Sequence, residues 1–150
     1  MIGDKVILLG TKGGPRITTG SSWPSSSVVE LSGRPYLVDC GMGVTRQFVE
    51  AGYDLGQINT ILLTHLHSDH CLELGPLLHT IWVSSPKREI KVYGPPGTSN
   101  LVVKFYEAMS YDIDMRIADE KQKNPRGMAN CMEFQDCLLY TSPSPRDRYG

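Results

Sequence analysis

The chain has 150 residues, of which 21% are charged, and its formal net charge at pH 7 is −1. This length accommodates one domain, and the near balance of charge lacks the basic excess that is typical of nucleic-acid-binding proteins. No apolar run approaches the ~20 residues of a membrane span, no signal peptide is visible, and the four cysteines form no CxxC pair, so we expect a cytoplasmic protein with reduced thiols and no membrane contact.

Three short strands are predicted near the N-terminus. Lys5–Leu9 is apolar and ends at the Gly-rich segment 10–15, which matches neither common phosphate-binding pattern and is interpreted as a tight loop beside a functional site. Residues 18–27 are rich in Ser, Thr and Gly and are predicted to form a loop. Val28–Leu31 and Pro35–Val38 are separated by Ser-Gly-Arg, which predicts a β-hairpin.

An acidic residue, Asp39, closes the second strand of this hairpin. A carboxylate at a buried strand end is costly unless it is hydrogen-bonded. One role is to cap the helix that follows, Val44–Ala51, which ends at Gly52. Cys40 and Cys71 are interpreted as small buried thiols, since cysteines are commonly buried for packing.

The densest cluster of metal-binding side chains follows the apolar run Ile58–Leu63, whose β-branched residues predict a buried strand. In an extended chain alternate side chains share one face, so His65, His67 and Asp69 are expected to converge. His70 follows where the chain changes direction, and we expect its ring to reach the same point. Three imidazoles and one carboxylate form a donor set that suits zinc, or manganese or iron.

The cluster leads into a helical pattern. Leu72–Trp82 carries apolar residues at helical spacing, and Gly75-Pro76 is expected to break this helix. The next apolar segment, Glu89–Tyr93, predicts a strand that ends at a Gly-Pro-Pro-Gly turn.

The last element expected from periodicity is a helix over Asn100–Met109, with Thr98 or Ser99 as its N-cap. Met115–Asn130 is polar and contains Pro and Gly, so it is predicted to be a loop. Residues 137–150 break the pattern of the chain and resemble the in-frame translation of a sequencing-library adapter. We therefore expect a domain over residues 1–136 and a non-native tail over 137–150.

The sequence His65-x-His67-x-Asp69-His70 resembles the metal-binding motif of the metallo-β-lactamase superfamily. Three further pieces resemble its ribonuclease Z and arylsulfatase-like branch: Leu8–Thr11, Leu37–Gly41 and Tyr93–Gly97. The resemblance runs from about Val6 to Phe134. It implies an α/β fold, the N-terminal half of an αββα sandwich, with one apolar sheet face left uncovered.

The resemblance also implies the layout of the site. Two divalent metal ions are expected, most simply zinc, with manganese or iron as alternatives. His65 and His67 would hold one ion, and Asp69 and His70 the other. Asp39 would lie beneath the metal-binding loop and orient a ligand, a role compatible with capping. The remaining ligands of the family come from later in the chain, and the only other histidine here is His79.

This chemistry fits a metal-dependent hydrolase that uses a metal-bound hydroxide, with Asp69 as a catalytic residue that accepts a hydrogen bond from the attacking water. The favoured substrate is a small phosphate or sulfate ester, because two positions depart from ribonuclease Z: Ser68 replaces the usual Gly, and Met42 replaces a Glu. The alternative is a ribonuclease Z-like endonuclease that processes the 3′ end of transfer RNA. A third interpretation is a non-catalytic or redox di-iron module. The family is also compatible with a homodimer of the parent protein, and the 150-residue chain itself is expected to be inactive.

Overall fold

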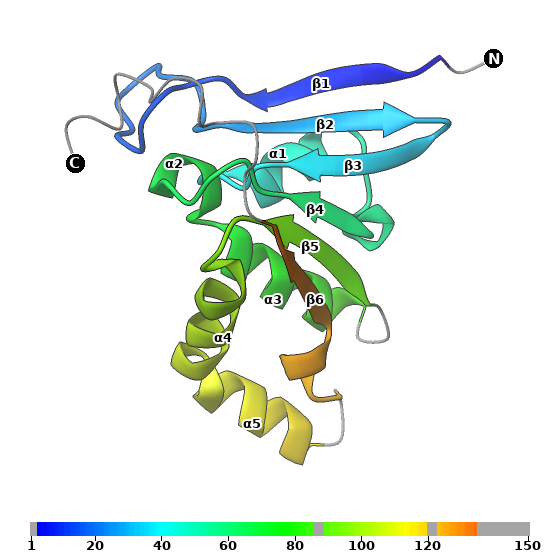
Figure 1. Ribbon diagram of the computed structural model, residues 1–150, viewed down its shortest axis with the longest axis vertical. Coiled ribbons are helices and arrows are strands. Elements are labelled where there is room, and N and C mark those ends of the chain that lie inside the picture. Colours follow the sequence, from blue (N-terminus) through cyan, green and yellow to red (C-terminus); the bar gives the residue numbers. More distant parts are fainter. Residues whose placement is uncertain (1–2, 86–88, 120–122, 135–150) are drawn as a thin grey trace.

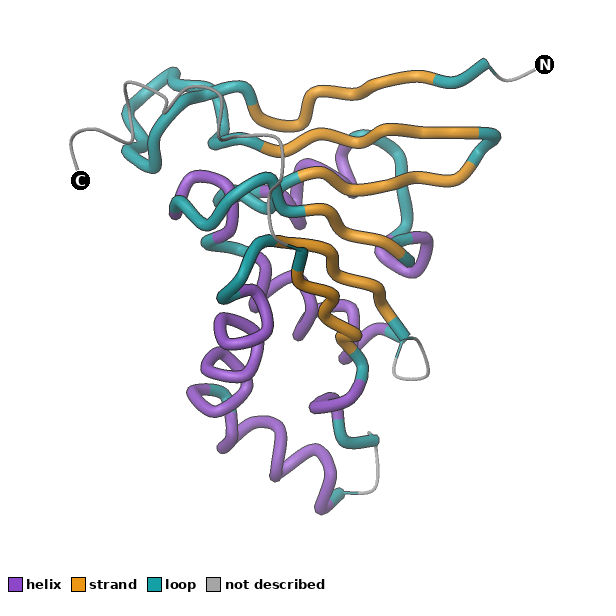
Figure 2. Tube along the Cα trace, in the orientation of Figure 1, coloured by secondary structure: helices purple, strands orange, loops and turns teal. Residues whose placement is uncertain are grey.

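The computed structural model describes residues 3–85, 89–119 and 123–134 (Figures 1 and 2). The segment interpreted as a non-native tail, 137–150, lies outside the described residues. The strands are β1 (Lys5–Gly10), β2 (Ser26–Leu31), β3 (Arg34–Val38), β4 (Thr60–Leu62), β5 (Ile90–Gly94) and β6 (Ala129–Glu133). The helices are α1 (Val44–Glu50), α2 (Ser68–Cys71), α3 (Leu74–Ser84), α4 (Thr98–Ala108) and α5 (Ser110–Ala118), with 3-10 turns η1 (Leu55–Gln57) and η2 (Pro125–Gly127).

The strands form one sheet in the order β1-β2-β3-β4-β5-β6. The first two pairings are antiparallel and the other three are parallel. The predicted hairpin of β2 and β3 is confirmed, and its two turn residues, Ser32 and Gly33, have φ angles of 50° and 75°. Positive φ at both positions gives the turn a twist that matches the flanking strands. The parallel strands β3, β4 and β5 bring their carboxyl ends to one edge of the sheet (Figure 1).

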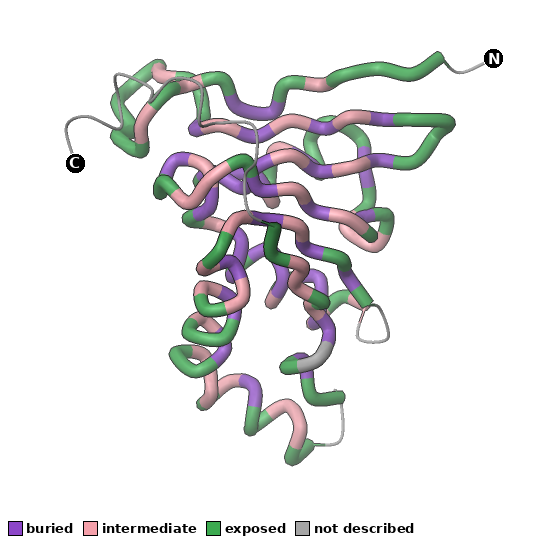
Figure 3. Tube along the Cα trace, viewed as in Figure 1, coloured by how far each residue is buried: buried purple, intermediate pink, exposed green. Residues whose placement is uncertain are grey.

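Helices α1 and α3 pack behind one face of the sheet, and this face holds the core (Figures 1 and 3). One row of cross-strand neighbours on it, Val28, Leu37, Ile61 and Val92, is buried to 1% exposure or less. These strand side chains belong to one cluster with apolar residues of the helices, which are Phe48, Leu77, Leu78, Ile81 and Trp82. Burial of this area from water is the main stabilising contribution to the fold.

The opposite face of the sheet is also apolar but is not buried. Its side chains are one residue out of step with the core row, as the two-residue period of a strand requires. One row crosses the whole sheet and consists of Leu8, Ser27, Val38, Leu62, Tyr93 and Met132. All six are exposed or partly exposed, and Leu8 retains 65% of its accessible surface. We call this surface the open face.

Two expectations about the helices are wrong. Helix α3 runs through Gly75 and Pro76 without a break. Pro76 lies in its first turn, where the backbone N–H has no partner within the helix and proline is tolerated. Helix α4 begins at Thr98, so neither Thr98 nor Ser99 is its cap. The carboxylate of Glu133 instead accepts hydrogen bonds from Gly97 N and Ser99 N, at 3.2 and 2.8 Å.

The prediction of a loop over Met115–Asn130 is also wrong. Residues 115–118 belong to α5, and Ala129 and Asn130 are the first two residues of β6, which pairs with β5 in parallel. Their apolar pattern is weak because neither element is deeply buried: the residues of β6 are exposed or partly exposed, and the buried residue of α5 is Ile113, which lies before the predicted loop. No helix within the described ranges has both the length and the apolar character needed to cross a membrane.

Candidate metal centre

Strand order places the predicted site residues together. Asp39 directly follows β3, and the histidine cluster begins three residues beyond the end of β4. Because β3 and β4 are parallel neighbours, both segments emerge at the same sheet edge. Backbone hydrogen bonds hold them there: Asp39 N donates to Leu62 O at 2.8 Å, and Cys40 N donates to His70 O at 2.6 Å. Carboxyl ends of parallel strands are a common position for binding sites in α/β sheets.

The backbone of the cluster differs from the expected extended chain. It is extended at His67, with φ −66° and ψ 145°, and then enters the short helix α2. Asp69 and His70 therefore come from a helical turn, not from continued strand geometry. The turn brings the Asp69 carboxylate to the ring of His70, which strict alternation would have placed on the other face.

The four side chains form two close pairs. His65 Nε2 lies 3.1 Å from His67 Nδ1, and His70 Nε2 lies 3.5 Å from Asp69 Oδ2. The rings of His65 and His70 are also adjacent, with centroids 4.1 Å apart. Two ligand atoms that share a tetrahedral zinc at ~2.0–2.1 Å are separated by ~3.3 Å. The two pairs thus fit the donor spacing of two metal positions, as the resemblance implies.

Each pair alone is an incomplete ligand set. Within the described ranges, no group of three or more His, Cys, Asp or Glu side chains is arranged to hold a metal ion. Cys40 and Cys71 do not join either pair. Burial, followed by the nearby Asp39 carboxylate, raises the pKa of both thiols, and Cys71 Sγ donates to Leu66 O. A protonated, buried thiol is a poor metal ligand.

Asp39 is buried, with 4% exposure, and holds the cluster from below. Its Oδ1 accepts from Thr64 N at 2.8 Å, and its Oδ2 lies 2.6 Å from His70 Nδ1. The expected contact between Asp39 and a residue of the histidine cluster therefore exists. Asp39 also has a φ of 62°, an uncommon conformation for a residue other than glycine. Such strain is often concentrated at functional sites.

The alternative role for Asp39, capping α1, is wrong. The N-cap position is Gly43, and the carboxylate of Glu73 accepts from Gly43 N and Thr45 N, at 2.5 and 3.0 Å. Glu73 was not identified from the sequence, because it lies 28 residues from Thr45 and 30 from Gly43, the two residues whose N–H groups it accepts from. With this capping role filled, Asp39 remains available to the histidine cluster.

We expect Glu73→Ala to lower the free energy of unfolding by about 1–2 kcal/mol, the usual effect of removing a helix cap. Chemical denaturation measures this change. Glu50→Ala is the control, because Glu50 lies on the exposed last turn of α1 and forms a surface ion pair with Arg46. Equal stability of the two variants would contradict the capping role of Glu73.

The Gly-rich loop after β1 reaches the site, as the sequence predicted. Gly14 N donates to Asp69 Oδ2 at 2.6 Å, and Gly14 has a φ of 81° that a side chain would disfavour. The backbone of Asp69 also packs against Gly41, where an added Cβ would lie 2.5 Å from Asp69 O. Neither contact was identified in advance, since both join segments far apart in the sequence.

The environment affects the pKa values of two site residues. Burial opposes the charged form of Asp69, but the hydrogen bond from Gly14 and the nearby His70 outweigh it and lower the pKa of this carboxyl. Burial, and then the adjacent His70 and His67, lower the pKa of His65. An ionised Asp69 and a neutral His65 are the forms that donate electron pairs.

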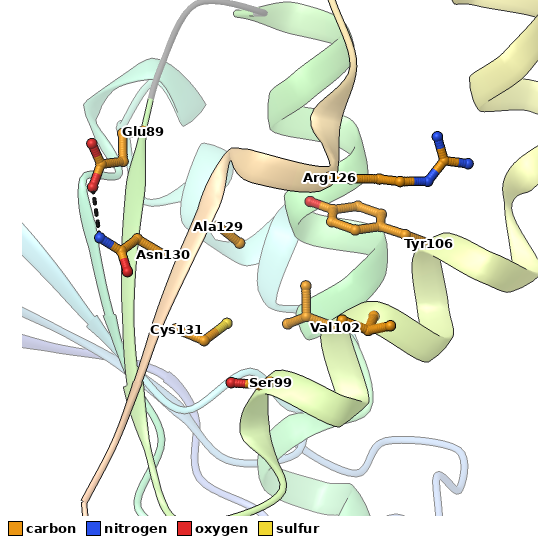
Figure 4. A pocket seen from close by; sticks show the side chains of 9 residues that line it. Glu89, Ser99, Val102, Tyr106, Arg126, Ala129, Asn130 and Cys131 are labelled. Atoms are coloured by element: carbon orange, nitrogen blue, oxygen red, sulfur yellow. Dashed lines mark hydrogen bonds between the residues drawn. The ribbon is translucent and has the colours of Figure 1, made fainter.

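A separate pocket of about 480 Å³ lies between α4 and β6 (Figure 4). Its polar lining includes Ser99, Arg126 and Asn130, and the hydroxyl of Tyr106 is buried there with no hydrogen-bond partner among the described residues. No residue of the histidine cluster lines this pocket. The candidate metal centre is therefore independent of it.

Comparison with known proteins identifies related families and structures. Residues 24–121, which include the whole histidine cluster, match the Metallo-beta-lactamase superfamily. Ribonuclease Z from Mycolicibacterium gilvum is 43% identical over 117 residues, which cover 76% of this chain and 40% of that protein. Ribonuclease Z from Mycobacterium avium is 38% identical over 135 residues, which cover 88% of this chain and 48% of that protein.

A similar solved structure is the short form of human tRNase Z, with a TM-score of 0.67 and 28% identity. The match covers 85% of this chain and 43% of that structure. The chain thus spans less than half the length of these relatives.

Proposed function

This chain belongs to the metallo-beta-lactamase superfamily, and we propose that it is the N-terminal half of a ribonuclease Z-like hydrolase that processes the 3′ end of transfer RNA. The proposal concerns the full-length protein, meaning a chain that continues to the length of these relatives. The observation that carries the reaction class is the pair of donor sets, His65 with His67 and Asp69 with His70. Similarity to ribonuclease Z supports RNA over a small ester as substrate.

In the proposed site His65 and His67 hold one divalent metal ion, and Asp69 and His70 hold a second. Zinc fits this nitrogen and oxygen donor set, and manganese and iron are the alternatives. Bound there, such ions supply Lewis-acid catalysis and activate water near neutral pH. In the full-length protein, further ligands from the remaining half would complete the site.

The residues of this chain have distinct roles in the proposal. Asp69, fixed by the N–H of Gly14, orients the attacking water by accepting its hydrogen bond. Asp39 fixes the ring of His70. Lys12 and Arg16 belong to the loop that contacts Asp69, and their cationic side chains suit the phosphates of an RNA backbone.

The small-ester interpretation keeps one supporting observation. Ser68 and Met42, the two departures from the ribonuclease Z pattern, are both exposed. Packing therefore does not require these residue types, and a difference in substrate would account for them. This observation makes the ester the second candidate.

The test is cleavage of a precursor transfer RNA by the full-length protein. We expect release of the 3′ trailer, loss of this activity on chelation, and recovery with zinc or manganese. An aryl phosphodiester and an aryl sulfate are assayed in parallel. Efficient turnover of either ester with poor RNA cleavage would favour the second candidate, and iron with neither activity would favour the redox module.

A further inference from the structure

A second side chain links Asp39 to the histidine cluster. The hydroxyl oxygen of Thr64 lies 3.0 and 2.8 Å from the two carboxylate oxygens of Asp39. The same oxygen lies 3.0 Å from Nδ1 of His65. Thr64 therefore stands between a carboxylate and an imidazole, and both are within hydrogen-bond distance of its single hydroxyl group.

Only one placement of the hydroxyl proton of Thr64 is favourable. A threonine hydroxyl has one proton, and an ionised carboxylate can only accept. If the proton pointed to His65, the hydroxyl and carboxylate oxygens would face each other at 2.8 Å with no proton between them. The hydroxyl must therefore donate to Asp39, so it can only accept from His65. This requires a proton on Nδ1 of His65.

Asp39 acts on His70 in the same way, but directly. Its Oδ2 lies 2.6 Å from Nδ1 of His70, which places a proton on that nitrogen. When each ring is neutral, the nitrogen left without a proton is Nε2. These are the two nitrogens that face His67 and Asp69, at 3.1 and 3.5 Å.

We propose that Thr64 is a positioning residue, which relays the carboxylate of Asp39 to His65 and fixes the tautomer that points the Nε2 lone pair at the first metal position. One buried carboxylate thereby sets the ligand atoms of both donor pairs: His70 by direct contact and His65 through Thr64. This inference deepens the proposed function, because it assigns how the site is prepared before metal binds.

The relay also determines which nitrogen of His67 carries its proton. With the proton of His65 on Nδ1, its Nε2 can only accept, so Nδ1 of His67 is the donor across the 3.1 Å contact. Metal binding by this pair needs the lone pair of that same Nδ1. We therefore expect the proton of His67 to lie on Nδ1 in metal-free protein and on Nε2 once zinc is bound.

The test is the tautomer of each histidine, read from ¹⁵N chemical shifts of the metal-free full-length protein at about pH 8, above the usual histidine pKa. We expect His65 and His70 to carry their proton mainly on Nδ1. Thr64→Val should move His65 to the Nε2–H form that water favours, whereas Thr64→Ser should retain the original tautomer. Thr60→Val is the matched control, because Thr60 lies at the start of β4, four residues before Thr64, and makes no side-chain hydrogen bond with a histidine in the described structure.

Several results would overturn the relay. If His65 carries its proton on Nε2 in the unaltered protein, the relay is contradicted without any variant. The test therefore gives a result even if Thr64→Val misfolds. An unchanged His65 tautomer in folded Thr64→Val contradicts the relay as well. The tautomers are measured without metal, so they stay interpretable even if the proposed function fails.

The consequence for metal binding is measured separately in the full-length protein. Thr64→Val should weaken zinc binding by ~10–100-fold, the range typical of hydrogen bonds that orient a ligand from outside the metal site. Competition with a chromophoric chelator gives this ratio. An affinity equal to that of Thr60→Val would show that the relay does not affect the metal site.

Discussion

His67→Ala in the full-length protein is expected to lose one of two bound metal ions and to lower the rate of RNA cleavage by roughly a thousandfold. The physical reason is that His67 and His65 form one donor pair, with nitrogens 3.1 Å apart, and removal of one member leaves a single imidazole from this chain. Lewis-acid stabilisation of charge in the transition state contributes several kcal/mol. Loss of about 4 kcal/mol corresponds to roughly a thousandfold in rate.

The pairing predicts a pattern across four variants. His65→Ala and His67→Ala should lose or weaken the same metal ion, and Asp69→Ala and His70→Ala the other. Metal content measured by mass spectrometry, together with single-turnover cleavage, tests this pattern. His79→Gln is the control, because His79 lies outside the cluster and contacts Asp112 at 2.9 Å. Full metal content in His67→Ala would show that the cluster is not the site.

The second large effect concerns the two faces of the sheet. Two adjacent residues of β1 lie on opposite faces. Leu8 lies on the open face with 65% exposure, and Leu9 lies in the core with 6% exposure. Leu9→Lys should cost at least the ~2–5 kcal/mol of a buried Leu→Ala change, since it also buries a charge. Leu8→Lys should leave the free energy of unfolding nearly unchanged.

Leu8→Lys should also reduce self-association of the 150-residue chain. A contiguous apolar sheet face in water promotes aggregation, and a charge at its edge opposes it. Light scattering after size-exclusion chromatography measures the association, and thermal unfolding measures the stability of each variant. Equal destabilisation by both substitutions, or a monomeric and freely soluble unaltered chain, would contradict this description of the open face.

The open face has a simple place in the proposed full-length protein. Two sheets of a sandwich pack face to face at ~10 Å, with apolar side chains from both filling the space between them. The row from Leu8 to Met132 presents such side chains on all but one of the strands. We expect the remaining half of the protein to cover this row, and the metal centre lies at the sheet edge where β3 and β4 end.

The sequence by itself determined the elements with a strong local pattern and predicted the chemistry of the site. The hairpin of β2 and β3, helix α1 and strand β5 follow from local apolar periodicity and turn residues. The histidine cluster indicated a metal site because three imidazoles and a carboxylate within six residues have few other uses. A donor set is a property of residue types, so no folding information was needed to recognise it.

Only the tertiary structure decided how those donors are held. Asp69 enters the site from a helical turn, Gly14 fixes it across 55 residues of sequence, and Thr64 joins Asp39 to His65. Helix α1 is capped by Glu73 and not by the nearby Asp39. Strand β6 exists because β5 pairs with it, although its own pattern predicts a loop. Apart from the local turn at Asp69, these features depend on hydrogen bonds between distant segments, and such bonds form only when the packing of the whole sheet brings donor and acceptor together.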